Sequence, residues 1–108
     1  MVPAAADAIN TWLDAAPQPE HAKIIPAARS LTAAIPAAVR LSPAGEWRSK
    51  WAEALARAAV LLPPAEVSPF ASAAEKALFG QPCGRDWNEQ ELKSRKLLEN
   101  LTKPTGPQ

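Results

Sequence analysis

The sequence predicts an all-α protein: a small single-domain helical bundle of four to six short helices joined by proline-punctuated links. Apolar residues recur at helical spacing along most of the chain, and many of the twelve prolines stand where a helix would begin. No segment shows the alternation of Val, Ile, Thr and aromatic residues that is typical of a strand. Because 108 residues suit one domain, we expect a helical domain over residues 1–102 and a flexible tail over residues 103–108.

The first expected helix follows Pro3 and ends near Ala16. Proline is pre-organised for the first helical turn, so Pro3 suits the beginning of the element. Its apolar face has i, i+3, i+4 spacing and consists of Ile9, Trp12 and Leu13. The prolines that come next predict a short, stiff link.

The stretch from Ile24 to Leu41 repeats Ile-Pro-Ala-Ala after ten residues. A period of ten is too short for a solenoid repeat. Proline inside a helix removes one backbone hydrogen bond and bends the chain. We therefore expect either two short helices or one helix kinked at Pro36.

The clearest predicted element is a helix with Ser42 as its N-cap and Pro43 in its first turn. It is expected to end before Pro63 and Pro64. Its apolar stripe follows the 3.6-residue period and contains Trp47, Trp51, Ala54, Leu55, Ala58 and Leu62. Glutamates and basic residues one turn apart occupy the opposite face, which predicts a solvated surface with i,i+4 ion pairs.

Two more helices are expected in the second half of the chain. Ser68 and Pro69 form a second start signal, and Gly80 is a typical stop. After a Gly/Pro loop, Asp86 and Glu89 have the spacing of a capping box, which predicts a last helix extending to about Leu101.

The composition argues against ordinary enzyme classes. The chain has one His, His21, and one Cys, Cys83, about sixty residues apart, with no motif that would bring them together. These two residues supply only half of a tetrahedral metal site. We therefore expect a non-catalytic protein with no cofactor and no metal.

The single cysteine, the N-terminal residues and the absence of an unbroken apolar segment predict a soluble cytoplasmic protein. A single cysteine favours a reducing compartment, and the N-terminal residues lack the basic region of a signal peptide. The segment Ile24–Ala44 contains two arginines and three prolines, so we expect it to be too charged and too broken to span a membrane. The Ala-, Pro- and Arg-rich usage suggests a bacterial or phage source.

The first functional hypothesis is a protein-interaction domain, such as a small accessory or inhibitory subunit that occludes a partner's surface. The partner is another protein or a second copy of this chain. Tryptophan and arginine often carry the binding energy of interfaces, although paired tryptophans in a small domain are more often core anchors. The candidate partner-binding residues are Trp47, Trp51, Trp87, Arg95 and Lys96.

The alternative is a nucleic-acid-associated accessory domain with a basic C-terminal helix. A net charge of +1 argues against strong nonspecific binding, because phosphate neutralisation needs a surplus of cations on one face. Any such binding is expected to be weak. The candidate phosphate contacts are Arg85, Lys93, Arg95, Lys96, Arg48 and Lys50.

Overall fold

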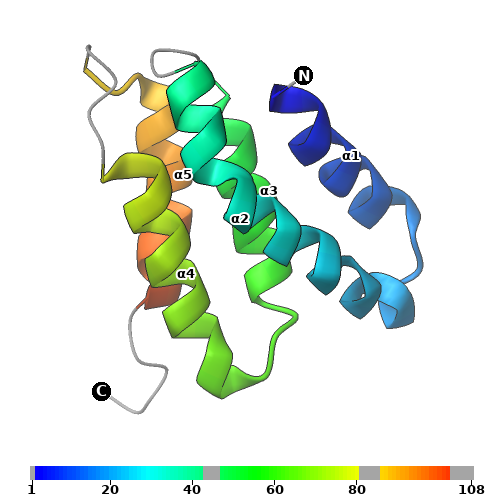
Figure 1. The fold of residues 1–108 in the computed structure, drawn as a ribbon. Helices are drawn as coiled ribbons and strands as arrows, with labels where there is room; N and C mark the ends of the chain where they lie inside the picture. Colours follow the sequence, from blue (N-terminus) through cyan, green and yellow to red (C-terminus); the bar gives the residue numbers. More distant parts are fainter. Residues whose placement is uncertain (1, 43–46, 81–85, 103–108) are drawn as a thin grey trace.

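The computed structural model describes residues 2–42, 47–80 and 86–102 and shows a helical bundle (Figure 1). These residues form one 3₁₀ helix and five α-helices, and they include no strand. The elements are α1 (Val2–Ala15), the 3₁₀ helix η1 (Gln18–Ile24), α2 (Ile25–Leu41), α3 (Arg48–Ala59), α4 (Pro64–Phe79) and α5 (Glu89–Thr102). The all-α prediction is confirmed, and the predicted tail at residues 103–108 lies outside the described residues.

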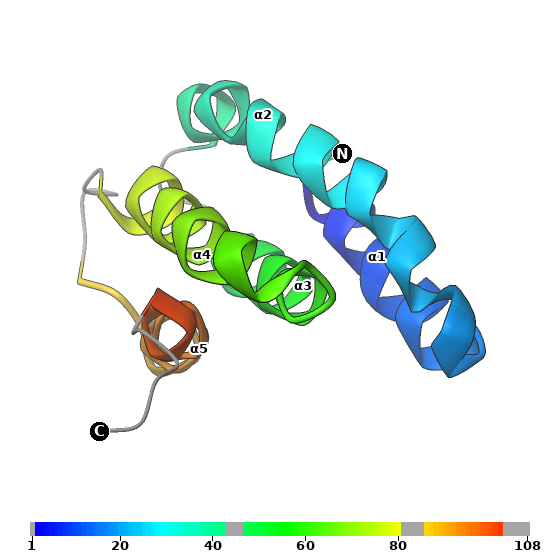
Figure 2. The ribbon, with the colours of Figure 1, turned by 90° about the horizontal axis from the view of Figure 1, so that it is seen from below.

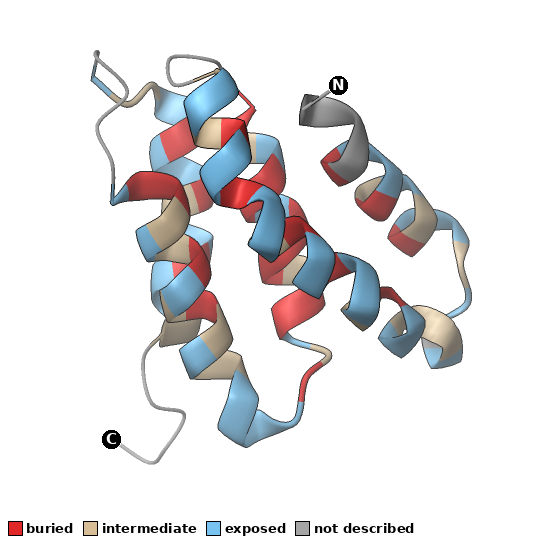
Figure 3. Ribbon diagram, viewed as in Figure 1, coloured by how far each residue is buried: buried red, intermediate tan, exposed pale blue. Residues whose placement is uncertain are grey.

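Helix α3 is the centre of the bundle and packs against each of the other four α-helices. Seen from below, α3 and α4 form a middle layer with α5 on one side and the pair α1 and α2 on the other (Figure 2). Helices α1 and α5 therefore lie on opposite sides of α3. This position explains why most of α3 is buried (Figure 3).

The core is built from the apolar stripes of all five α-helices. Trp47 and Trp51 pack edge to face at its centre, with their ring centroids 4.9 Å apart. Such geometry is favourable beyond the area that the two rings bury. The Trp47 indole nitrogen also donates a 2.8 Å hydrogen bond to the carbonyl of Ser42, which ties the beginning of α3 to the end of α2.

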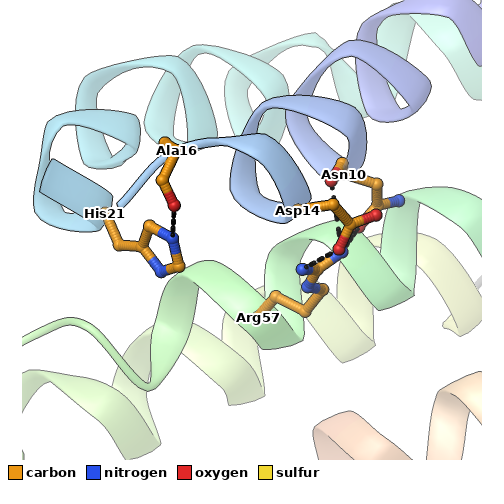
Figure 4. A network of polar contacts seen from close by, with 5 residues as sticks. All are labelled: Asn10, Asp14, Ala16, His21 and Arg57. Atoms are coloured by element: carbon orange, nitrogen blue, oxygen red, sulfur yellow. Dashed lines mark hydrogen bonds and ion pairs between the residues drawn. The ribbon is translucent and has the colours of Figure 1, made fainter. Parts of the chain in front are cut away.

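Polar contacts on the outer side of the bundle join α1 to α3 (Figure 4). Arg57 Nη2 donates a 2.7 Å hydrogen bond to Asp14 Oδ1, and Nη1 donates to Asn10 Oδ1 at 3.1 Å. Two turns earlier on both helices, Lys50 Nζ lies 3.2 Å from Asp7 Oδ1. Lys50 and Arg57 of α3 thus pair with aspartates of α1, whereas the sequence predicted ion pairs between residues of the same helix.

Two helices contain a proline in their interior, which decides between the two alternatives left open at Pro36 and contradicts the helix start expected at Pro69. Helix α2 continues through Pro36, so the segment is one helix rather than two. Helix α4 begins at Pro64, which places Pro69 in its interior instead of at its start. Ser68 is not a cap, and its hydroxyl donates a 2.7 Å hydrogen bond to the carbonyl of Thr102 at the end of α5.

The predicted start of the central helix is also wrong. Ser42 is the C-cap of α2, because its backbone N–H bonds to the carbonyl of Ala38 at 2.9 Å. Pro43 lies outside the described residues. Helix α3 itself begins at Arg48 and ends at Ala59, shorter than the sequence pattern suggested.

The capping box of α5 exists two residues later than predicted. Asn88 Oδ1 accepts a 2.8 Å hydrogen bond from the backbone N–H of Glu91, and Glu91 Oε1 accepts one from the N–H of Asn88 at 2.9 Å. This reciprocal pair satisfies two donors at the helix start. The N-cap is therefore Asn88 and not Asp86. Glu89 is an exposed residue of the first turn.

The 3₁₀ helix η1 runs directly into α2, and together they form a continuous helical segment, Pro19–Leu41, that is long and apolar enough to cross a membrane by length and composition alone, with a mean hydropathy of 1.2. The prolines of this segment do not interrupt the helix, so that part of the reasoning from sequence is wrong. The expectation that the charged segment Ile24–Ala44 does not span a membrane stays a prediction. Only 28% of the apolar window is buried inside the protein. The core helix of a soluble protein can have the same length and hydropathy. What the finding describes here is how apolar the exposed surface of α2 is.

Candidate partner-binding surfaces

An open apolar groove of about 890 Å³ lies between α1 and α2, with α3 beneath it. Its size falls within the range of ligand sites in proteins, about 300–1,000 Å³. None of its lining side chains is charged. The lining residues are Ala8, Ile9, Trp12, Ile24, Ala27, Ser30, Leu31, Ala34, Ala37, Ala38, Leu41 and Trp51.

Helix α2 forms one wall because it carries two neighbouring stripes at helical spacing. The first stripe is buried in the core; it begins at Ile24, the last residue of η1, and continues with Ala28, Leu31, Ile35 and Ala38 of α2. The second lines the groove with spacings of three and four residues and contains Ala27, Ser30, Ala34, Ala37 and Leu41. Residues three and four apart share a helix face, so the second stripe is continuous. The outer side of α2 is accordingly exposed (Figure 3).

Large side chains form the ends and floor of the groove. Trp51 belongs to the floor and is only 3% exposed. Leu41 lies at the C-terminal end of α2 and is 78% exposed, which is unusual for a leucine in a packed domain. The groove therefore combines a rigid buried base with an exposed apolar rim.

Trp12 lines the opposite wall and is fixed by the turn that follows α1. The His21 ring lies 6.1 Å from the Trp12 ring, centroid to centroid, in a tilted arrangement. His21 Nε2 donates a 2.8 Å hydrogen bond to the carbonyl of Ala16 (Figure 4). His21 thus closes the turn between α1 and η1, and this contact positions the wall of the groove.

The structure places the predicted tryptophans mainly in the core. Trp47 and Trp51 are 4% and 3% exposed, so they are core anchors and present little surface to a partner. Trp87 is half-buried and packs edge to face on Phe79, with ring centroids 5.2 Å apart. Of the three, Trp51 alone lies in the apolar groove.

The two predicted basic contacts of α5 differ in their surroundings. Arg95 is half-buried, and its Nε lies 3.2 Å from Glu99 Oε1 and 3.5 Å from Glu75 Oε1, with the guanidinium over the ring of Phe79. Lys96 is exposed. Arg95 therefore contributes to the packing of α5 on α4, and only Lys96 has the exposure expected of a partner contact.

The residues predicted to bind nucleic acid are only partly brought together. Arg48 has no exposed surface, and its guanidinium carbon lies 5.1 Å from the ring centroids of both Trp47 and Trp87. A phosphate contact does not fit this burial, so that assignment of Arg48 is wrong. Arg85 lies outside the described residues.

Two of the predicted cations do share a surface. Lys50 and Lys93 line a polar groove of about 560 Å³ between α3 and α5. Its remaining lining residues are Ser49, Glu53, Asn88, Gln90, Ser94 and Leu97. Glu53 is the acidic residue of this set, so the groove combines both signs of charge.

No group of three His, Cys, Asp or Glu side chains that could hold a metal ion is found within residues 2–42, 47–80 and 86–102. Cys83 falls outside these ranges, so the expected lack of a Cys–His pair stays a prediction. His21 has the structural contacts described above.

Sequence reasoning missed the apolar groove. Its signal is the three- and four-residue spacing of Ala27, Ser30, Ala34, Ala37 and Leu41, which predicts a second apolar stripe beside the core stripe of α2. Alanine carries little apolar area, so the stripe is weak in any hydrophobicity pattern. Comparison of the chain with protein-family models, with curated proteins and with solved structures gives no significant match.

Proposed function

We propose that this protein is a protein-interaction domain that binds an apolar helical segment of a partner in the groove between α1 and α2. The observation that carries the proposal is the groove itself: about 890 Å³ of open space lined by uncharged, almost entirely apolar side chains. Exposed apolar grooves of this kind are a common docking site for amphipathic helices.

The groove also offers the parts of an energetically effective interface. Trp51 and Leu31 form a buried base. Leu41 and the half-buried Trp12 stand at the edges, where a partner would cover them. Large side chains that become buried at the centre of an interface dominate the binding free energy. Occupation of the groove would hide a partner's apolar face, consistent with an accessory or inhibitory subunit.

The test compares two alanines of α2 that differ in one respect. Both Ala33 and Ala34 are exposed, but only Ala34 lines the groove. Ala34→Glu places a charge in the groove, whereas Ala33→Glu places the same charge beside it. Affinity capture from cells that naturally produce the protein, with quantitative mass spectrometry, should recover a partner with the wild type and with Ala33→Glu but not with Ala34→Glu.

A second candidate, nucleic-acid binding, is favoured by one observation. Lys50 and Lys93 line the same polar groove, and the exposed Lys96 follows Lys93 by three residues, about one turn of α5. Glu53 in the same groove opposes phosphate binding. The expected signature is weak binding with a steep salt dependence, and an electrophoretic shift at low salt that disappears in a Lys50→Glu, Lys93→Glu variant would support it.

A further inference from the structure

We infer that the polar groove between α3 and α5 is the interface of a weak, twofold-symmetric dimer, in which Lys93 of each copy pairs with Glu53 of the other. This inference goes beyond the proposed function and concerns a different surface. The apolar groove lies between α1 and α2, which are on the other side of the middle layer from α5 (Figure 2). The inference depends on the charges that line the polar groove and on the symmetry of a dimer.

Two side chains of opposite charge line the polar groove without a partner in the described part of the chain. Glu53 lies on α3 and Lys93 on α5, and both are exposed. No hydrogen bond or ion pair joins either of them to another residue of the described ranges. Lys50, the other charged residue of the lining, pairs with Asp7 of α1 at 3.2 Å. Within the described residues, the groove therefore offers one cation and one anion to a partner.

A second copy of the same groove supplies both of the missing charges. The two copies of a twofold dimer contact each other through the same surface, so every contact between two residues is made twice. A surface with one available cation and one available anion is then complementary to itself, with two equivalent pairs of Lys93 and Glu53. A partner surface of a single sign, such as the phosphates of a nucleic acid, would attract Lys93 but would be repelled by Glu53.

The packing of the helices is suited to such a contact. Helices α3 and α5 pack extensively on each other, and the groove runs between them. Leu97 follows Lys93 by four residues on the same face of α5, and it is 45% exposed. A ridge made of Lys93 and Leu97 that enters the groove of a second copy is ordinary ridge-into-groove packing. It would bury Leu97 and join α3 and α5 of the two copies into a four-helix arrangement.

The size of the groove indicates how strong this dimer is. Eight described residues line about 560 Å³ of space, whereas a stable interface involves about 20–30 residues on each side. We therefore expect a dissociation constant that is micromolar or weaker, so that monomer and dimer coexist. In an interface this small, the two ion pairs decide whether a dimer forms.

The experiment measures self-association of the full chain by sedimentation equilibrium at low salt, from about 10 µM to 1 mM. The wild type should pass from monomer towards dimer over this range. Glu53→Lys and Lys93→Glu each place like charges opposite one another twice, so each should weaken the dimer at least about tenfold. The double variant exchanges the two signs and should dimerise like the wild type. An equimolar mixture of the two single variants should form a heterodimer, since all facing charges are then opposite.

Lys96→Glu is the matched control. Lys96 is an exposed lysine of the same helix, three residues from Lys93, and it does not line the groove. This variant should leave the dimer unchanged, and circular dichroism checks that every variant is folded, as expected for exposed positions.

Three results would overturn the inference. The first is a wild type that stays monomeric at 1 mM, whether or not it binds a nucleic-acid probe. The second is a double variant, and a mixture of single variants, that associate no better than each single variant alone, since the two charges then do not face each other. The third is a dimer that Ala34→Glu dissociates and Lys93→Glu does not, because a second copy would then occupy the apolar groove. Only the third result also contradicts the proposed function.

Discussion

Arg57 of α3 donates to Asp14 and to Asn10 of α1 with the two arms of one guanidinium group, at 2.7 and 3.1 Å. The three residues hold the C-terminal half of α1 against α3 and so fix one wall of the apolar groove. Their exposure is unequal, because the Asp14 side chain is 70% exposed and that of Arg57 is 34% exposed. This difference leads to a prediction about which partner matters more.

Removal of Arg57 should destabilise the fold more than removal of Asp14. Asp14→Ala breaks one exposed ion pair and should cost less than about 1 kcal/mol. Arg57→Ala also removes the contacts with Asn10 and the packing of the arginine stem, and should cost about 1–2 kcal/mol. Urea denaturation followed by circular dichroism measures both. Equal losses would mean that the contacts with Asn10 contribute nothing.

The position of the capping box predicts which polar residue at the start of α5 stabilises it. Asn88→Ala should cost about 1 kcal/mol, the usual value for loss of an N-cap. Glu89→Gln changes an exposed first-turn charge and should cost at most about 0.5 kcal/mol through the helix dipole. Thermal denaturation of the two variants compares them directly. A larger loss for Glu89→Gln would instead support the box at Asp86 and Glu89 that the sequence suggested.

The two basic residues Arg95 and Lys96 should respond differently to charge reversal. Arg95→Glu brings a third carboxylate to Glu75 and Glu99 and removes the cation from Phe79, so it should cost about 1 kcal/mol or more. Lys96→Glu changes an exposed side chain and should cost less than about 0.5 kcal/mol. Denaturant midpoints of the single variants give the comparison. If both variants keep the wild-type midpoint, the Arg95 contacts have no energetic role.

Trp51 should be a centre of stability. A buried aromatic replaced by alanine typically costs about 3–5 kcal/mol. A domain of this size has a total stability of about 5–15 kcal/mol, so Trp51→Ala can be partly unfolded at 25 °C. Trp51→Phe keeps an aromatic ring and should retain a cooperative transition at a lower midpoint. A Trp51→Ala protein that melts within a few degrees of the wild type would contradict the burial of this side chain.

The sequence was sufficient for the fold class, because apolar residues such as Trp47, Trp51 and Leu55 follow the helical period that the structure buries. It did not reveal that the charged residues Arg48 and Glu91 are buried as well. It was insufficient for helix boundaries at prolines. A proline in a helix interior costs about 3 kcal/mol, so Pro36 predicted a break or a kink. Helix α2 continues because the buried stripe on both sides of Pro36, with Leu31, Ile35 and Ala38, packs only if the helix is unbroken. The stabilisation that these buried side chains give to α2 depends on tertiary contacts, and a local sequence pattern does not contain them.

The capping box and the groove are two features that the local sequence alone does not determine. The residues from Asp86 to Glu91 contain two overlapping boxes, and the sequence alone does not choose between them. The structure uses Asn88 and Glu91, which places Glu91, Ser94 and Leu98 on one buried face. The groove, likewise, depends on how far apart α1 and α2 lie over α3. The second apolar stripe of α2 can be found in the sequence, but no single helix contains that distance, so the stripe alone does not predict a groove.

The apolar contacts and ion pairs that hold α1 against the rest of the bundle affect the dynamics of the protein. Helix α1 packs on α2, η1 and α3 through one narrow apolar stripe, and both of its ion pairs with α3 are solvent-exposed, whereas α3, α4 and α5 pack extensively on one another. Local opening follows the least buried contacts, so amide hydrogens of α1 should exchange with solvent at a lower free energy than those of α3. Because exposed ion pairs are screened by salt, this opening becomes easier as ionic strength rises. An uncharged groove would thereby acquire a width that responds to salt.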